Sequence, residues 1–380
     1  MAAFGRSKIH PQLALALLAL ALVSCVSPGR YTSLDLAVLP CELGEAPDFF
    51  LPIEFTADGT YLYPQQKDTV LADLRRGEFA DLIFFLHGWN KSPASAELDY
   101  QNFICRFHGK LDASLQNLKR QGKLRVIGVF WPSTITNRQQ EPWLLKPLSY
   151  FKIRKRVDRI AVDGFAPLLG EIGEVIIDLE RSGDPATAPR RLHLIGHSFG
   201  GRMIIRSFQK LSDEDRLIPI LQALDATNVT LINAAAPPTF FDWIDPSVAS
   251  AWKLGLRGRF APESSSYLLN LHSQQDSANR ILFRIASIFS PDPVSCAVGA
   301  CGIPNRPTLC VDTSGKVIEP PQVDAAAPDL NVRNIDTTSV VYSHTDIYKG
   351  RMATLIADLL YGKATREILR RPAPIDAQCQ

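Results

Sequence analysis

The sequence of 380 residues has almost no net charge, no block of like charges and no internal repeat. With a formal charge of +2 and no such block, nothing in the sequence suggests a surface that binds nucleic acid through its phosphates. A hydrophobic content of 46% is enough for one large α/β domain or two small ones.

The sequence also lacks a strongly apolar run long enough to cross a bilayer. Its longest run, Leu13–Val23, has eleven residues, whereas roughly 30 Å of hydrocarbon needs about 20. Arg6 and Lys8 precede this run, and such an order is typical of a secretory signal peptide.

The signal-like segment ends in Leu22-Val23-Ser24-Cys25, which resembles a bacterial lipobox. We therefore expect residues 1–24 to be removed, Cys25 to be lipidated, and residues 25–47 to tether the protein to a membrane of the cell envelope. The alternatives are an ordinary signal peptide with a chance cysteine and an uncleaved anchor.

Six cysteines remain after Cys25, and an even number in an oxidising compartment favours disulfides. The pairing cannot be derived from the sequence. The cluster between Cys296 and Cys310 is expected to staple a Pro/Gly-rich excursion. A zinc site is the weaker alternative, because Cys-x4-Cys without a nearby histidine does not match zinc-ligand spacing.

Short apolar runs alternate with stretches of helical spacing along the chain. We expect buried strands at 81–88, 124–132, 191–196, 228–237, 266–273 and 331–336, a hairpin over 48–63 turning at Asp58-Gly59, and helices at 96–119, 154–179, from about Gly200, and 346–360. This alternation predicts an α/β fold with a mostly parallel central sheet and helices on both faces. The expected domain spans 48–370, with a cysteine-containing insert at about 291–328 and a tail at 371–380.

One motif on this framework carries chemistry: Gly196-His197-Ser198-Phe199-Gly200 fits the pattern G-x-S-x-G. In this pattern a serine sits on a sharp strand-to-helix turn, and glycine two residues to either side avoids collisions. A zinc site at His193 and His197 does not fit, because residues four apart on a strand lie about 13 Å apart. We expect His193 to pack in the strand and His197 to shape the turn.

A nucleophilic serine needs a base and an acid, expected in the order serine, acid, histidine. Among seven histidines only His344 follows a last strand and precedes a terminal helix. Asp276, just after the penultimate core strand, is the expected acid. Asp242 and Asp245 are alternatives one strand earlier.

An oxyanion hole requires two backbone N–H groups. We expect one from Phe199, directly after the serine, and the other from the loop "HGWN" at 87–90. In that loop Gly88 permits close approach and Trp89 is the preferred donor.

These motifs together resemble the α/β-hydrolase superfamily, and more narrowly its bacterial esterase/lipase-like members of unknown function. The matching segments are "LHGWN", "FWPS", "GHSFGG", "NLHSQQD" and "SHTDIY". The resemblance covers about residues 81–360 and implies a serine hydrolase with Ser198, Asp276 and His344 as its triad. The cysteine-bearing insert is longer than the usual connection in that family.

The expected function is hydrolysis of small-molecule or lipid carboxylic esters, without metal or organic cofactor. Aromatic-rich segments at 141–151 and 237–252 would favour an apolar acyl group if they formed walls or lids, but simple packing on the sheet is equally consistent. Acyl transfer, thioester hydrolysis, amide cleavage and a non-catalytic envelope binding protein remain as alternatives.

Overall fold

A single parallel sheet organises the chain. The computed structural model describes residues 50–77, 81–108, 124–135, 146–182, 191–224, 226–242, 244, 248, 266–284, 296–320, 332–345, 350–369, 371, 373–374 and 379. Its strands are β1 (Phe50–Glu54), β2 (Asp81–Leu86), β3 (Leu124–Phe130), β4 (Arg191–His197), β5 (Ala226–Ile232), β6 (Leu268–His272), β7 (Thr308–Cys310) and β8 (Val332–Asp336). They lie in the order β1-β3-β2-β4-β5-β6-β8-β7, and every pairing is parallel.

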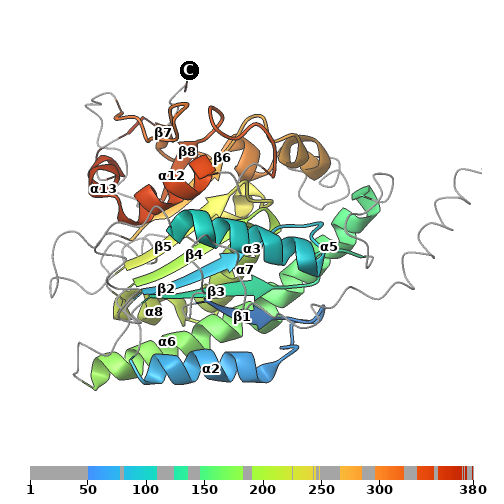
Figure 1. The fold of residues 1–380 in the computed structure, drawn as a ribbon, viewed down its shortest axis with the longest axis vertical. Helices are drawn as coiled ribbons and strands as arrows, with labels where there is room; N and C mark the ends of the chain where they lie inside the picture. Colours follow the sequence, from blue (N-terminus) through green and yellow to red (C-terminus); the bar gives the residue numbers. More distant parts are fainter. Residues whose placement is uncertain are drawn as a thin grey trace, which may run out of the picture.

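Helices cover both faces of the sheet (Figure 1). One face packs against α2 (Pro64–Arg75), α5 (Lys146–Ile160), α6 (Ala166–Arg181), α7 (Phe199–Asp213) and α8 (Leu217–Ala223). The other face packs against α3 (Pro93–His108) and α12 (Gly350–Tyr361), which is followed by α13 (Lys363–Leu369). A π-helical turn, η2 (Ala161–Phe165), joins α5 to α6.

The central strands are apolar on both faces because both faces are covered. In β2, Phe84 packs in the core on the α7 side, while Phe85 packs in the core on the α3 side. Leu194 and Ile195 of β4 divide in the same way. Continuous apolar runs of this kind are what a fully covered parallel sheet requires, and the α/β architecture expected from the sequence is confirmed.

The expected hairpin at the start of the domain is wrong in its second half. Gly59 turns the chain with a φ of +94°, but only one antiparallel bridge, between Phe55 and Tyr61, follows. The first half, β1, pairs in parallel with β3 instead. The helix α2 was not expected either, because its sequence PQQKDTVLADLR is mostly polar and buries only Val70, Leu71, Asp73 and Leu74.

Two disulfides are described in the C-terminal third. Cys296 pairs with Cys301 across the short helix α11 (Val298–Cys301), and Cys310 of β7 pairs with Cys379. Cys105 is also disulfide-bonded. No group of three or more potential metal ligands exists within the described ranges. The cysteine cluster therefore contributes disulfides, as its spacing favoured.

The insert that carries α11 packs directly against the carboxyl edge of the sheet. The Gly299 N–H donates to the Ala234 carbonyl after β5, and the Gly299 carbonyl accepts a hydrogen bond from the Ser273 N–H after β6. A β-carbon on Gly299 would collide with the Asn233 backbone. The insert thus connects two of the loops at the edge where the candidate residues lie.

Candidate active site

The strand-to-helix turn between β4 and α7 has the strained geometry that its sequence predicts. Ser198 adopts φ 55° and ψ −116°, a left-handed conformation that costs non-glycine residues on the order of 1–3 kcal/mol. A β-carbon at Gly200 would collide with the Leu86 carbonyl oxygen, and one at Gly196 would lie 2.6 Å from the Gly201 nitrogen. The two glycines are needed because the turn packs against both the next helix and β2.

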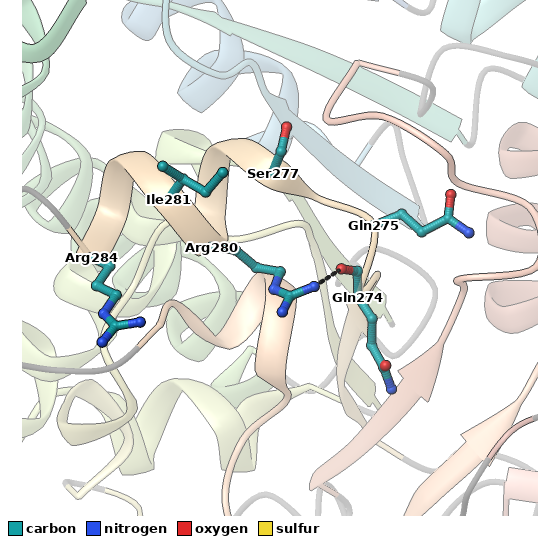
Figure 2. A pocket seen from close by; sticks show the side chains of 6 residues that line it. All are labelled: Gln274, Gln275, Ser277, Arg280, Ile281 and Arg284. Carbon is teal, nitrogen blue, oxygen red and sulfur yellow. Dashed lines mark hydrogen bonds between the residues drawn. The ribbon is translucent and has the colours of Figure 1, made fainter.

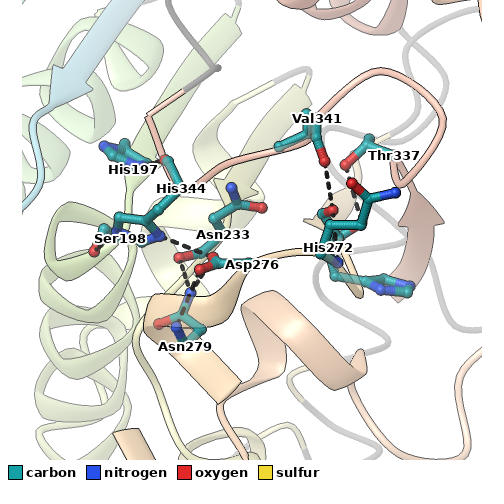
Figure 3. Close-up of polar contacts among 11 residues, drawn as sticks. His197, Ser198, Asn233, His272, Asp276, Asn279, Thr337, Val341 and His344 are labelled. Atoms are coloured by element: carbon teal, nitrogen blue, oxygen red, sulfur yellow. Dashed lines mark hydrogen bonds and ion pairs between the residues drawn. The ribbon is translucent and has the colours of Figure 1, made fainter. Parts of the chain in front are cut away.

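Three of the expected residues meet at this turn (Figure 3). The Ser198 Oγ lies 2.8 Å from Nε2 of His344, and the His344 Nδ1 lies 2.8 Å from Oδ2 of Asp276. The Asp276 side chain is fully buried, whereas 20% of the His344 side chain is exposed. A carboxylate can only accept, so Nδ1 donates to Asp276 and the lone pair of Nε2 faces the serine hydroxyl.

Asp276 has a second partner that the sequence analysis missed. Asn279, in the π-helical turn η4 (Ala278–Leu282), donates its backbone N–H to Oδ1 at 3.0 Å and its side-chain amide to Oδ2 at 2.8 Å. The same amide reaches the Asn233 carbonyl at 2.6 Å. In the sequence, the spacing Asp-x-x-Asn was the available signal for this contact, because an aspartate side chain can accept a hydrogen bond from the backbone N–H three residues later.

Two hydrogen bonds hold the loop that carries His344. Ser273 donates its hydroxyl to the Val341 carbonyl at 2.7 Å, and Nε2 of His197 lies 2.9 Å from the carbonyl oxygen of His344 itself. Burial, and then the neighbouring His344, lower the pKa of His197 well below its usual value. His197 is therefore neutral and donates through Nε2–H, so it does more than shape the turn.

The loop after β2 lies against the serine. A β-carbon at Gly88 would lie 2.9 Å from Cβ of Ser198, so only glycine permits this approach. Asn90 has a φ of 63°, and its N–H donates to the Ser133 carbonyl in the "FWPS" segment. Neither the Trp89 nor the Phe199 backbone N–H has an acceptor in the described part of the chain. Both amides are available to an incoming oxygen.

His87 holds the same loop in place through its side chain. Its Nδ1–H donates to the Gly88 carbonyl at 2.8 Å, its Nε2 lies 3.4 Å from the Trp131 N–H, and its ring stacks on the Trp131 indole. Complete burial lowers the pKa of His87 to about 3. The imidazole is consequently neutral over the whole physiological range.

Because His87 is buried and neutral, we expect the free energy of unfolding to fall in acid. Below about pH 6.5 the unfolded chain binds a proton at His87 that the folded chain does not, so stability is lost as the pH falls, by about 1.4 kcal/mol per unit. Between pH 7 and pH 5 the loss from His87 alone should reach about 2 kcal/mol. We expect His87→Gln to reduce the pH dependence by that amount in urea unfolding curves. An unchanged slope would show that the imidazole is protonated in the folded state.

A groove of about 590 Å³ opens on the outside of the loop that carries Asp276 (Figure 2). Its lining consists of Gln274, Gln275, Ser277, Arg280, Ile281 and Arg284. Arg280 donates to the Gln274 carbonyl at 3.0 Å and so closes the turn. The buried Asp276 side chain does not line this groove, which lies outside the serine site.

The structure does not bring the remaining candidates to the serine. His193 is buried in β4 and accepts a hydrogen bond from Asn228, and burial lowers its pKa well below the usual value. Asp242 is exposed at the end of η3 (Pro238–Phe241). Asp245, Cys25, the 1–24 signal segment and the 25–47 tether lie outside the described residues, as do much of 141–151 and 237–252. Within the described ranges, no helix is long and apolar enough to span a bilayer.

Comparison with known proteins adds little. No family model and no curated protein matches the chain. A solved structure, that of an uncharacterized protein from Pseudomonas aeruginosa, is 10% identical with a TM-score of 0.29, and covers 85% of this chain and 53% of its own. The chain thus spans about half the length of that protein. A similarity of this size says nothing about function, for which the geometry of the site is the evidence.

Proposed function

We propose that this protein is a serine hydrolase that acts on carboxylic esters, exported and tethered to the cell envelope through Cys25. The proposal rests chiefly on the unbroken chain of hydrogen bonds from Ser198 through His344 to Asp276, set on a strained turn at the carboxyl edge of a parallel sheet. Ligand sites in such sheets lie at this edge. Two amides without acceptors, those of Trp89 and Phe199, face the same turn.

The chemistry follows from the protonation states. Nε2 of His344 takes the Ser198 proton as the serine oxygen attacks the ester carbonyl, and Asp276 stabilises the imidazolium that forms. The Trp89 and Phe199 amides hold the negative oxygen, helped by the N-terminus of α7. His344 then gives the proton to the leaving alcohol. Water attacks the acyl-enzyme by the same steps and releases the acid.

A fluorophosphonate probe tests the proposal on the purified protein, because it phosphonylates activated serines without needing the natural substrate. We expect stoichiometric labelling, with the modified peptide containing Ser198. No labelling, or labelling elsewhere, would contradict the proposed nucleophile. Acyl transfer and thioester hydrolysis use the same acyl-enzyme, and product analysis with added alcohol or thioester separates them from ester hydrolysis.

His197 is expected to act through the base and not on the substrate. His197→Leu removes the donor to the His344 carbonyl and should lower kcat about ten- to hundredfold, since losing one buried hydrogen bond costs about 1–3 kcal/mol. KM should change little. His197→Gln keeps an N–H donor and should retain most of the activity. Equal losses in both variants, or a matching fall in Tm, would indicate a purely structural role.

A further inference from the structure

The order of the strands separates the two halves of an ester bound at Ser198. β4, which leads into Ser198, lies between β2 and β5. Asp276 and His344 follow β6 and β8, on the β5 side, whereas Trp89 follows β2 on the other side. Because His344 must protonate the leaving group, the leaving group lies toward β5 and β6. If the proposed function holds, the acyl group therefore lies toward the β2 loop and α5.

Three aromatic rings pack against one another on that side. The Trp89 and Phe199 rings are 6.4 Å apart, the Trp89 and Tyr150 rings 5.7 Å, and the Tyr150 and Phe199 rings 5.1 Å. Trp89 and Phe199 are also the residues whose amides would hold the oxyanion. The acyl chain, which begins at the carbonyl carbon, would therefore lie directly against these rings.

This aromatic group contains two buried donors without partners. The indole Nε1 of Trp89 and the hydroxyl of Tyr150 are both inaccessible to solvent, and neither has a hydrogen-bond partner among the residues that the structure describes. Leaving such a group unpaired costs about 1–3 kcal/mol, and most buried polar groups are paired. Burial raises the pKa of Tyr150, so its hydroxyl keeps its proton.

A cation lies one helical turn beyond Tyr150. Arg154 is half-buried on α5, and residues four apart on a helix are neighbours. No hydrogen bond or ion pair involves its guanidinium in the described part of the chain. The nearby carboxylate of Asp158 is already engaged by both Nε and Nη2 of Arg202, at 2.7 and 2.8 Å. The group of two guanidiniums and one carboxylate therefore carries an uncompensated positive charge.

These groups share one chemical property: Trp89 Nε1, Tyr150 Oη and Arg154 can all donate hydrogen bonds, and none of these donors is paired with an acceptor in the described part of the chain. We infer that the acyl group of the substrate ends in a carboxylate, which Arg154 binds and whose oxygens accept neutral hydrogen bonds from Tyr150 and Trp89. The methylenes between the two ends would pack on the Trp89, Phe199 and Tyr150 rings. The substrate class is thus a half-ester of a dicarboxylic acid, and the acid product is the free dicarboxylate.

Pairs of methyl esters test the inference. Mono-methyl esters of dicarboxylic acids from succinate to suberate are compared with methyl esters of monocarboxylic acids of the same carbon number, with acid release followed in a pH-stat. We expect kcat/KM to favour the half-ester by about tenfold or more at one chain length, the effect of a single charged hydrogen bond. Arg154→Gln should abolish that preference by lowering kcat/KM for the half-ester to that of the matched neutral ester. Arg159→Gln, an exposed arginine on the same helix, should change neither.

Tyr150→Phe gives a second, nearly isosteric test. It should lower kcat/KM for the half-ester several-fold more than for the neutral ester, with an unchanged Tm. Tyr267→Phe removes another buried hydroxyl without a partner, just before β6, and should alter neither ester. A wild-type protein that labels at Ser198 but turns over both esters equally, or neither, overturns the carboxylate inference and leaves the hydrolase proposal standing. Failure to label Ser198 overturns the hydrolase proposal itself.

Discussion

Replacing Ser198 with alanine should lower ester turnover by a factor of about 10⁴ to 10⁶, the largest effect expected of any single substitution in this protein. In the proposed mechanism this hydroxyl forms the acyl-enzyme, and His344, whose Nε2 lies 2.8 Å away, accepts its proton as it attacks. Any residual activity would come from the two free amides acting on a bound ester and water. The strained backbone is the same for alanine, so the fold should not change.

The measurement is kcat/KM on the best methyl ester, together with Tm. Ser207→Ala is a matched control, because Ser207 is a buried serine on the same helix whose hydroxyl bonds only to the Ala161 and Met203 carbonyls. It should keep near-normal turnover. If Ser198→Ala retains more than about one per cent of the activity, another residue is the nucleophile.

Replacing Asp276 with asparagine should cost about 10⁴-fold in kcat. Asn279 already donates to both carboxylate oxygens of Asp276. An asparagine here would keep its carbonyl on one of those donors and turn its amide group toward Nδ1 of His344. Nδ1 would then have to accept, so the proton would move to Nε2, and the imidazole could no longer accept the serine proton.

The pH profile of Asp276→Asn distinguishes an acid that positions His344 for proton transfer from one that only supports the fold. Hydroxide can partly replace the lost base, so the remaining activity should rise more steeply with pH than that of the wild type. Asp242→Asn is the matched control, since Asp242 is the exposed alternative acid and should have no effect. Equal activity of Asp276→Asn and wild type would reject Asp276 as the acid.

Much of this arrangement was predictable because it depends on local sequence. The buried strands β2 to β6 and β8 were expected from continuous apolar runs, and the turn at Ser198 from its paired glycines. His344 and Asp276 were predicted from their place after late strands, and they now lie in one hydrogen-bonded chain. What these three residues do chemically stays a prediction.

Other features could not be read from the sequence. The segment after Asp58-Gly59 resembles a hairpin strand, yet β1 pairs in parallel with β3, which follows it by about 70 residues in the sequence. Ser273 looks like an ordinary loop residue until the fold puts it beside Val341. The cysteine insert looks only like a connection of unusual length, whereas α11 in fact connects the loops after β5 and β6.

The sequence by itself determined the alternation of strand and helix, the strained serine turn and the identity of the acid and base candidates. Each of these follows from residues close together in the chain, where periodicity and backbone sterics decide. The tertiary structure decided that His197 holds the His344 carbonyl, that Cys310 pairs with Cys379, and that the rings of Trp89, Tyr150 and Phe199 pack together. These contacts join residues as much as 147 positions apart, and only the packing of helices on a common sheet brings such residues together.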